Sequence, residues 1–95
     1  MVLAYAVFDL HLPGCRSLKE KRMIVRSLKS RLRNQFEISA AEVGSQDLLQ
    51  RAELAVAAVG PDQGPLDALL QKILAFVEQN LDGELLNFRN EFIHV

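Results

Sequence analysis

The chain has 95 residues, of which 49% are hydrophobic and 24% charged, and its formal net charge at pH 7 is −1. This size and composition are typical of one globular domain over residues 1–95, and they exclude a fibrous or disordered chain. Because Cys15 is the only cysteine, they also exclude an internal disulfide. We expect a cytoplasmic location, since the apolar N-terminal run lacks the basic start of a signal peptide and is too short to span a membrane.

Residues 2–12 predict a strand, which ends at Pro13-Gly14. Alternate positions form one wholly apolar face, and the opposite face begins with Leu3, Tyr5 and Val7 before it becomes polar. A strand that is apolar on one face and half apolar on the other is typical of the centre of a sheet.

The next element is a helix that begins at Ser17 and runs to about Asn34. Its first residues, Ser-Leu-Lys-Glu, form a capping box, in which the Ser17 hydroxyl accepts the amide of Glu20 and the Glu20 carboxylate accepts the amide of Ser17. Apolar residues gather on an arc roughly 120° wide at helical spacing. Lys21 falls within this arc, and we expect its long side chain to extend outward to solvent.

Residues 36–43 predict a second strand, residues 44–47 a turn, and residues 51–59 a third, largely buried strand. Gly60-Pro61 ends this strand.

Pro65 suits the first turn of a second helix, whose apolar residues repeat at helical spacing as far as Leu81. Gly83 is the expected C-terminal stop of this helix, and residues 85–95 predict a last strand.

The order strand, helix, strand, strand, helix, strand predicts an α+β fold. Right-handed crossovers give a ferredoxin-like βαββαβ sandwich, a four-stranded antiparallel sheet with two helices on one face. The other face is then uncovered, and Leu3, Tyr5 and Val7 would lie on it. An exposed apolar patch of this kind favours a partner, and we expect a homodimer through the open sheet face.

At residues 17–22 the sequence Ser-Leu-Lys-Glu-Lys-Arg resembles the YlxP-like family of small bacterial proteins, a domain-of-unknown-function family. The resemblance covers essentially the full length, including Phe-x-Ile-Ser-x-x-Glu-Val at residues 36–43, Gln46-Asp47 and Gln50-Arg51-Ala52. It implies a ferredoxin-like fold and a link to translation, because the family is often encoded beside translation factors and a ribosome-binding factor. It implies no established activity and no catalytic residues.

Charge is divided unevenly along the chain. Residues 16–33 hold eight of the eleven basic residues and one acid, whereas the other residues hold three basic residues against eleven acids. Like charges at helical spacing destabilise a helix by about 0.2–0.5 kcal/mol per pair, so their retention indicates a functional surface. Five cations at spacings of 3, 4, 3 and 4 residues form what we call the basic stripe: Lys19, Arg22, Arg26, Lys29 and Arg33.

We expect this basic helix to contact the phosphates of structured RNA, such as ribosomal RNA, without reading bases. Stacking of bases on the sheet is disfavoured, because the third strand has no aromatic residue. The expected RNA- or anion-binding residues are Arg16, Ser17, Lys19, Lys21, Arg22, Arg26, Lys29 and Arg33. In the competing interpretation the stripe is merely solvated, or is neutralised by Glu37, Glu42, Asp47 or Glu53.

A second hypothesis is a homodimeric protein-interaction module that docks an acidic partner and binds no RNA. A third is an acylphosphatase-like enzyme, with an anion held at Gly14, Arg16 and Ser17. We disfavour catalysis, because the third strand lacks the asparagine that such enzymes carry there. The sequence assigns no catalytic residue and no cofactor.

Three further residues invite other chemistry. His11 and His94 lie near the ends of the first and last strands, and a metal site would require these strands to be neighbours. Strand-end histidines are usually structural, so we assign no metal. Cys15 precedes a helix N-terminus, which would lower the pKa of its thiol, although an incidental loop thiol is the favoured interpretation.

Overall fold

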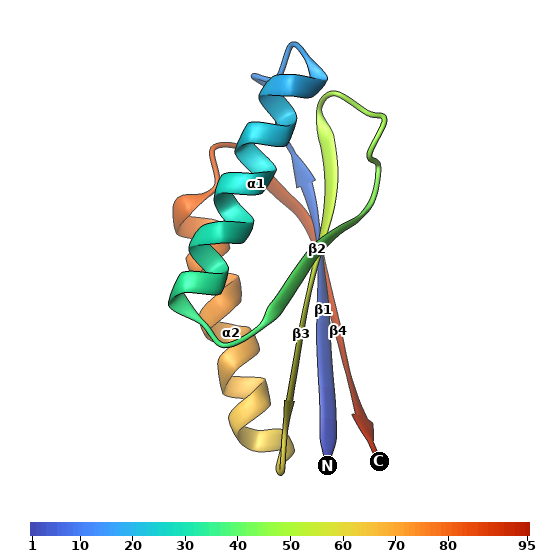
Figure 1. Cartoon of the computed structure of the whole chain (residues 1–95), viewed down its shortest axis with the longest axis vertical. Helices are drawn as coiled ribbons and strands as arrows, with labels where there is room; N and C mark the ends of the chain where they lie inside the picture. Colours follow the sequence, from blue (N-terminus) through green and yellow to red (C-terminus); the bar gives the residue numbers. More distant parts are fainter.

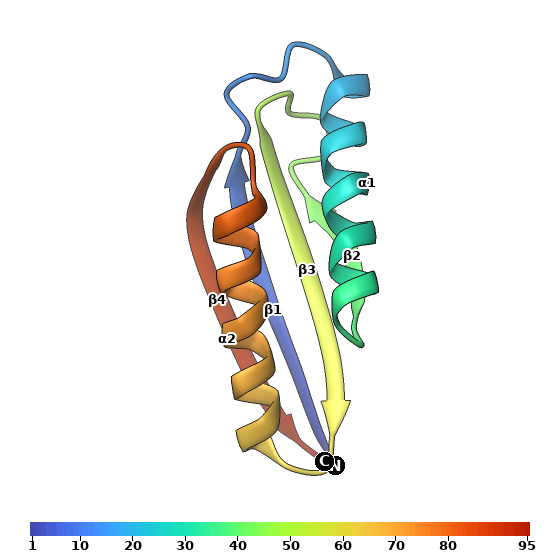
Figure 2. The same cartoon turned by 90° about the vertical axis from the view of Figure 1, so that its left-hand side faces the viewer.

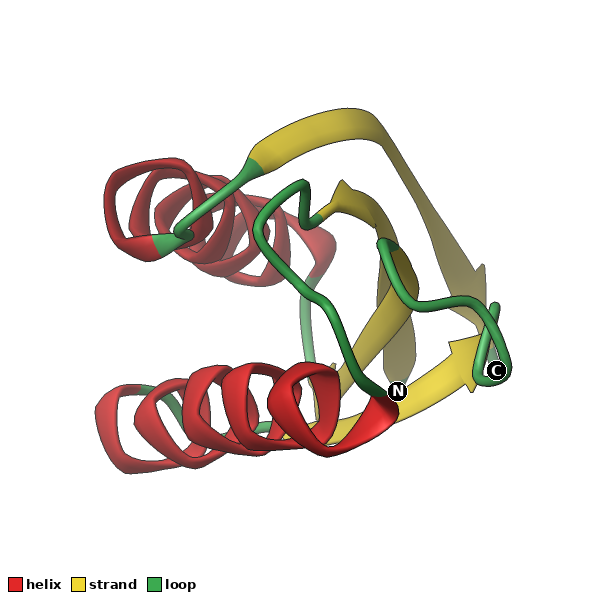
Figure 3. Cartoon of the chain, turned by 90° about the horizontal axis from the view of Figure 1, so that it is seen from above, coloured by secondary structure: helices red, strands yellow, loops and turns green.

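The computed structural model describes residues 1–95 and has the predicted order of elements (Figure 1). These are β1 (Val2–His11), α1 (Leu18–Gln35), β2 (Ser39–Gly44), β3 (Arg51–Gly60), α2 (Gln63–Asn80) and β4 (Glu84–His94). The strands form one antiparallel sheet in the order β2-β3-β1-β4. α1 packs toward the β2 edge and α2 packs over β1 and β3 (Figure 2), so both helices cover the same face (Figure 3). The ferredoxin-like α+β sandwich is confirmed.

One hydrophobic core lies between the sheet and the helices. Its fully buried side chains come from every layer, with Phe8 from β1, Leu54 from β3, Leu32 from α1 and Ile73 from α2. The Phe8 ring also packs on Phe88 of β4, with ring centroids 5.1 Å apart. The wholly apolar face of β1 therefore supplies the centre of the core, as predicted.

On the opposite face of β1, one residue is less exposed to solvent than the sequence predicted. Leu3 is 37% exposed and Tyr5 is half-buried, but Val7 is only 6% exposed. Val7 lies in the middle of the sheet, with Ala55 of β3 and Arg89 of β4 as its cross-strand neighbours. Neighbouring side chains at this spacing shield a central residue from water, so Val7 does not form the exposed contact point that the sequence predicted.

The strand β2 is shorter than the predicted strand at residues 36–43. Phe36 caps the C-terminus of α1, and its amide donates to the Leu32 carbonyl. Its ring packs edge-on against Phe76 of α2, with centroids 5.8 Å apart. The apolar character of Phe36 thus reflects contact between the two helices and not a strand.

Helix α2 begins two residues before Pro65 and ends at Asn80, with an extended backbone at Leu81. Gly83 has no positive φ, so it is not the left-handed helix stop that the sequence predicted. A Cβ at Gly83 would instead lie 2.3 Å from the carbonyl oxygen of His11. Glycine is required there because the turn before β4 passes against the backbone at the end of β1. Neither helix has the length and apolar character needed to cross a lipid bilayer.

Candidate functional site

The N-terminus of α1 is capped by its own side chains. The Ser17 hydroxyl accepts the amide of Glu20 at 3.1 Å, as predicted. The Glu20 carboxylate, however, accepts the amide of Arg16 at 2.8 Å, one residue before the predicted donor. The only acid of the basic segment therefore belongs to the cap. The Glu20 carboxylate also accepts the hydrogen bond of the Arg16 amide, which an acylphosphatase-like site would need to bind its anion.

Lys21 does not extend to solvent, which corrects the prediction from the sequence. Its side chain is buried, and the ammonium donates to the carbonyls of Ser45 at 2.5 Å and Gln46 at 3.3 Å. It also lies 3.2 Å from a carboxylate oxygen of Glu42. A buried ammonium is retained where acceptors replace its water, and the loop between β2 and β3 supplies them. Lys21 is consequently not accessible to a phosphate at the surface.

The basic stripe lies at the surface of α1. Four of its residues are exposed and Lys29 is half-buried. The chain contains three ion pairs within 4.0 Å, and none includes a residue of the stripe. Of the acids expected to neutralise it, Glu42 pairs with Lys21 and the others form no ion pair. The stripe therefore has no internal carboxylate partner.

Helix α1 packs beside the edge strand β2 (Figure 2), and the stripe contacts that strand at one point. At the C-terminal end of the stripe, the Arg33 guanidinium donates to the carbonyl of Ala40 in β2 at 2.6 Å. This contact fixes Arg33 at the sheet edge and leaves its charge without a carboxylate. The other cations share one flank of α1 with Arg33 by helical spacing, while Arg16 is exposed just before the helix.

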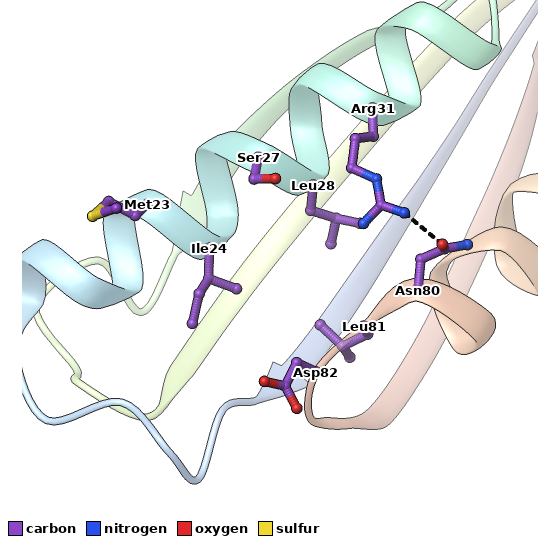
Figure 4. Close-up of a pocket in the computed structure, with 8 residues that line it drawn as sticks. All are labelled: Met23, Ile24, Ser27, Leu28, Arg31, Asn80, Leu81 and Asp82. Atoms are coloured by element: carbon purple, nitrogen blue, oxygen red, sulfur yellow. Dashed lines mark hydrogen bonds between the residues drawn. The ribbon is translucent and has the colours of Figure 1, made fainter.

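Arg31 lies on the other flank of α1, where a groove of about 280 Å³ separates α1 from the end of α2 (Figure 4). Its guanidinium donates to the side chain of Asn80 at 2.5 Å and lies 5.6 Å from the centroid of the Phe76 ring. Sequence reasoning missed this groove, because it arises only from the packing of two helices distant in the sequence. The groove is lined by Met23, Ile24, Ser27, Leu28, Arg31, Asn80, Leu81 and Asp82.

The two histidines lie at opposite ends of the sheet. His11 pairs with Glu84 in the β1–β4 ladder, and their side chains are 3.6 Å apart, whereas His94 pairs with Val2. The first and last strands are neighbours, but β1 and β4 run antiparallel, so the two histidines do not share a site. No three His, Cys, Asp or Glu side chains are grouped to hold a metal ion.

Cys15 is a residue of the hydrophobic core and is 1% exposed. Burial raises the pKa of its thiol, with a further contribution from the nearby Glu20 carboxylate. The lowered pKa considered for a thiol near a helix N-terminus is thus not found, because burial disfavours the thiolate, and Cys15 is a core residue and not an incidental loop thiol.

Residues 3–90 match the family described as "Protein of unknown function (DUF503)". The chain belongs to this family. It is also 39% identical over 77 residues to "Uncharacterized protein YlxP" of Bacillus subtilis (strain 168). The aligned residues make up 81% of this chain and 84% of that relative. The resemblance to YlxP-like proteins is thus confirmed. Neither description assigns an activity.

Proposed function

We propose that this protein is a non-catalytic, cytoplasmic RNA-binding protein whose basic stripe contacts the phosphates of ribosomal or another structured RNA. One observation carries the proposal: five cations share one flank of α1, and none has a carboxylate partner. The chain has twelve acids against eleven bases, so acids to neutralise the stripe are available in number. Their placement elsewhere leaves the positive charge for an external anion.

The dimensions of the stripe suit a polyphosphate backbone. From Lys19 to Arg33 it extends along roughly 21 Å of helix, at about 1.5 Å per residue. Successive cations are neighbours on the helix surface, with Cβ atoms about 5–6 Å apart. A row of this kind neutralises several phosphates at once and releases their counterions, which favours binding without any sequence preference.

The sheet offers little for base recognition. Tyr5 is the single aromatic residue on the open face, and its hydroxyl donates to the Glu91 carboxylate at 2.6 Å. That acidic neighbour would repel a phosphate beside a stacked base. Contact through the backbone or the shape of a folded RNA therefore fits the charge distribution better than readout of unpaired bases.

The test replaces Arg22, Arg26 and Lys29 by Glu and measures fluorescence anisotropy with a labelled hairpin fragment of ribosomal RNA. The control variant replaces Arg31, Lys72 and Arg89 by Glu, which makes the same change in net charge away from the stripe. We expect the stripe variant to lose at least about tenfold in affinity and the control to lose much less. Circular dichroism checks that both variants fold.

Equal affinities of the two variants would overturn the assignment of the stripe. A crosslinking pull-down with and without nuclease then addresses the competing function. Recovery of one acidic protein after nuclease treatment, without affinity for free RNA, would replace RNA binding by protein docking.

A further inference from the structure

The open face of the sheet has a bulky column beside a column of small residues. The odd-numbered residues of β1 lie on this face, and Leu3 and Tyr5 form its bulky column, with Val7 buried beside them. Beside them, β3 contributes Ala57 and Ala55 in register with Tyr5 and Val7. The edge strand continues the small residues with Ser39 and Ala41, which pair with Ala57 and Ala55.

The small column makes the surface hollow. One hollow of about 280 Å³ lies over the alanines of β2 and β3, with Tyr5 at its border. A second hollow of about the same size extends from Tyr5 to Leu3 and Val59. The apolar side chains around it are uncovered, because Leu3 is 37%, Val59 63% and Ile93 45% exposed. This apolar surface is therefore neither flat nor filled by the chain itself.

We propose that a second copy of this chain covers the open face, with a two-fold axis parallel to the strands and midway between β1 and β3. Rotation about that axis places β1 of each copy over β3 of the other at the same height. Tyr5 then lies over the partner's Ala57, and Val7 lies over the partner's Ala55. Tyr5 therefore meets a small residue of the partner, whereas Leu3 meets Val59 in an apolar contact, and the symmetry makes every contact twice.

We infer a second copy of the chain from this self-complementarity and from the area that the two faces would bury. Four strands about 4.8 Å apart, over roughly nine residues at 3.3 Å, give a face of about 500–600 Å² per copy. Two such faces bury on the order of 1,000–1,200 Å², which reaches the lower end of stable, specific interfaces. Aligned sheets diverge by about 30°, so the contact centres on the apolar rows. The charged residues of the face lie at one end, where Asp9 and Glu53 are in register, and along the edge strand β4, where Arg89 and Glu91 lie beside Val7 and Tyr5.

The arrangement leaves both helices of each copy on the outside of a four-layer sandwich. Both basic stripes stay accessible, so the dimer neither requires nor blocks the proposed RNA contact. The dimer stands on the register of the sheet alone, and its failure would leave the RNA proposal intact.

The test is the mass of the full chain in solution, by light scattering after size exclusion and by sedimentation equilibrium. The wild type is expected at twice the chain mass of 10.6 kDa, falling toward one chain mass on dilution. Ala57→Glu places a charge at the centre of the contact and is expected to give the monomer. Ala75→Glu, the same change at an exposed position of α2, is expected to keep the dimer. Leu3→Lys is a second interface variant that does not depend on Ala57.

Tyrosine emission gives an independent measurement, because Tyr5 is the only tyrosine and the chain has no tryptophan. Its emission is expected to change on dilution in the wild type and in Ala75→Glu, and not in Ala57→Glu. A monomeric wild type at millimolar concentration would overturn the proposal, whether or not another protein binds this face. A dimer that survives both Ala57→Glu and Leu3→Lys with folded spectra would also overturn it.

Discussion

The Lys21 ammonium lies 3.2 Å from the Glu42 carboxylate, inside the protein and not at its surface. The ammonium donates hydrogen bonds to the carbonyls of Ser45 and Gln46, and the Glu42 carboxylate supplies the opposite charge beside it. The contact joins the first turn of α1 to the loop between β2 and β3. It therefore fixes the helix that carries the basic stripe against the sheet.

Loss of Lys21 is expected to destabilise the fold. Lys21→Met leaves Glu42 without its ion-pair partner, although the Glu42 side chain is only 17% exposed to water. Removing one partner of a buried pair costs about 3–5 kcal/mol, and the partial exposure of Glu42 favours the lower value. Urea denaturation measures the free energy of unfolding. Lys19→Met on the exposed stripe is the control, with an expected change within about 0.5 kcal/mol. Similar stabilities for these two variants would contradict the structural role of Lys21.

The buried position of Lys21 illustrates what could not be predicted from the sequence. The apolar arc of α1 and the alternation in β1 are local patterns, so the elements and their order followed from spacing alone. The partners of Lys21 are 21–25 residues away in sequence and meet it only after the chain folds. A lysine inside an otherwise apolar arc was itself the available signal of a buried ion pair.

The basic stripe could be located from the sequence for the same reason, since helical spacing fixes the flank that its residues share. Its lack of carboxylate partners could not be predicted, because that depends on where acids such as Glu37 and Glu53 come to lie. The relation of His11 to His94 likewise depended on the direction of β4 relative to β1.

Gly83 and Gly64 provide a matched pair of glycine substitutions. Gly83→Ala would place a Cβ 2.3 Å from the His11 carbonyl oxygen, and relief of this clash would require the backbone of β1 to shift. We expect a loss of about 1–3 kcal/mol in the free energy of unfolding. Gly64→Ala in the first turn of α2 meets no atom within 4 Å, so it is expected to be neutral or to stabilise by up to about 1 kcal/mol. Thermal and urea denaturation of both variants test the opposite signs, and a loss of stability in Gly64→Ala alone would refute the argument.

The pKa of the Tyr5 hydroxyl is expected above its ordinary value. Its hydrogen bond to Glu91 is the main cause, followed by partial desolvation and repulsion between the phenolate and that carboxylate. The hydrogen bond requires the protonated hydroxyl, so its stabilising effect is complete below the unfolded pKa of about 10. The effect is lost as the pH rises through the higher folded pKa.

Ultraviolet titration of the phenolate measures this pKa directly, because the chain has one tyrosine. Glu91→Gln is expected to shift the titration toward the ordinary value by removing the negative charge. Glu84→Gln, at the other end of β4, is expected to leave it unchanged. A Glu91→Gln titration that coincides with that of the wild type would show that the Tyr5–Glu91 contact does not govern the hydroxyl.

The salt dependence of RNA affinity tests how many stripe cations contact phosphates. Each phosphate neutralised on a duplex contributes about −0.9 to the slope of log affinity against log salt concentration. Contact by the whole stripe predicts a slope of about −4 to −5 for a hairpin RNA. Arg26→Gln is expected to weaken binding and to reduce the slope by about 1, since Arg26 is exposed at the middle of the stripe. Lys72→Gln on α2 is expected to change neither quantity. A slope near zero, or one that Lys72→Gln changes as much as Arg26→Gln does, would indicate that RNA is bound by another surface.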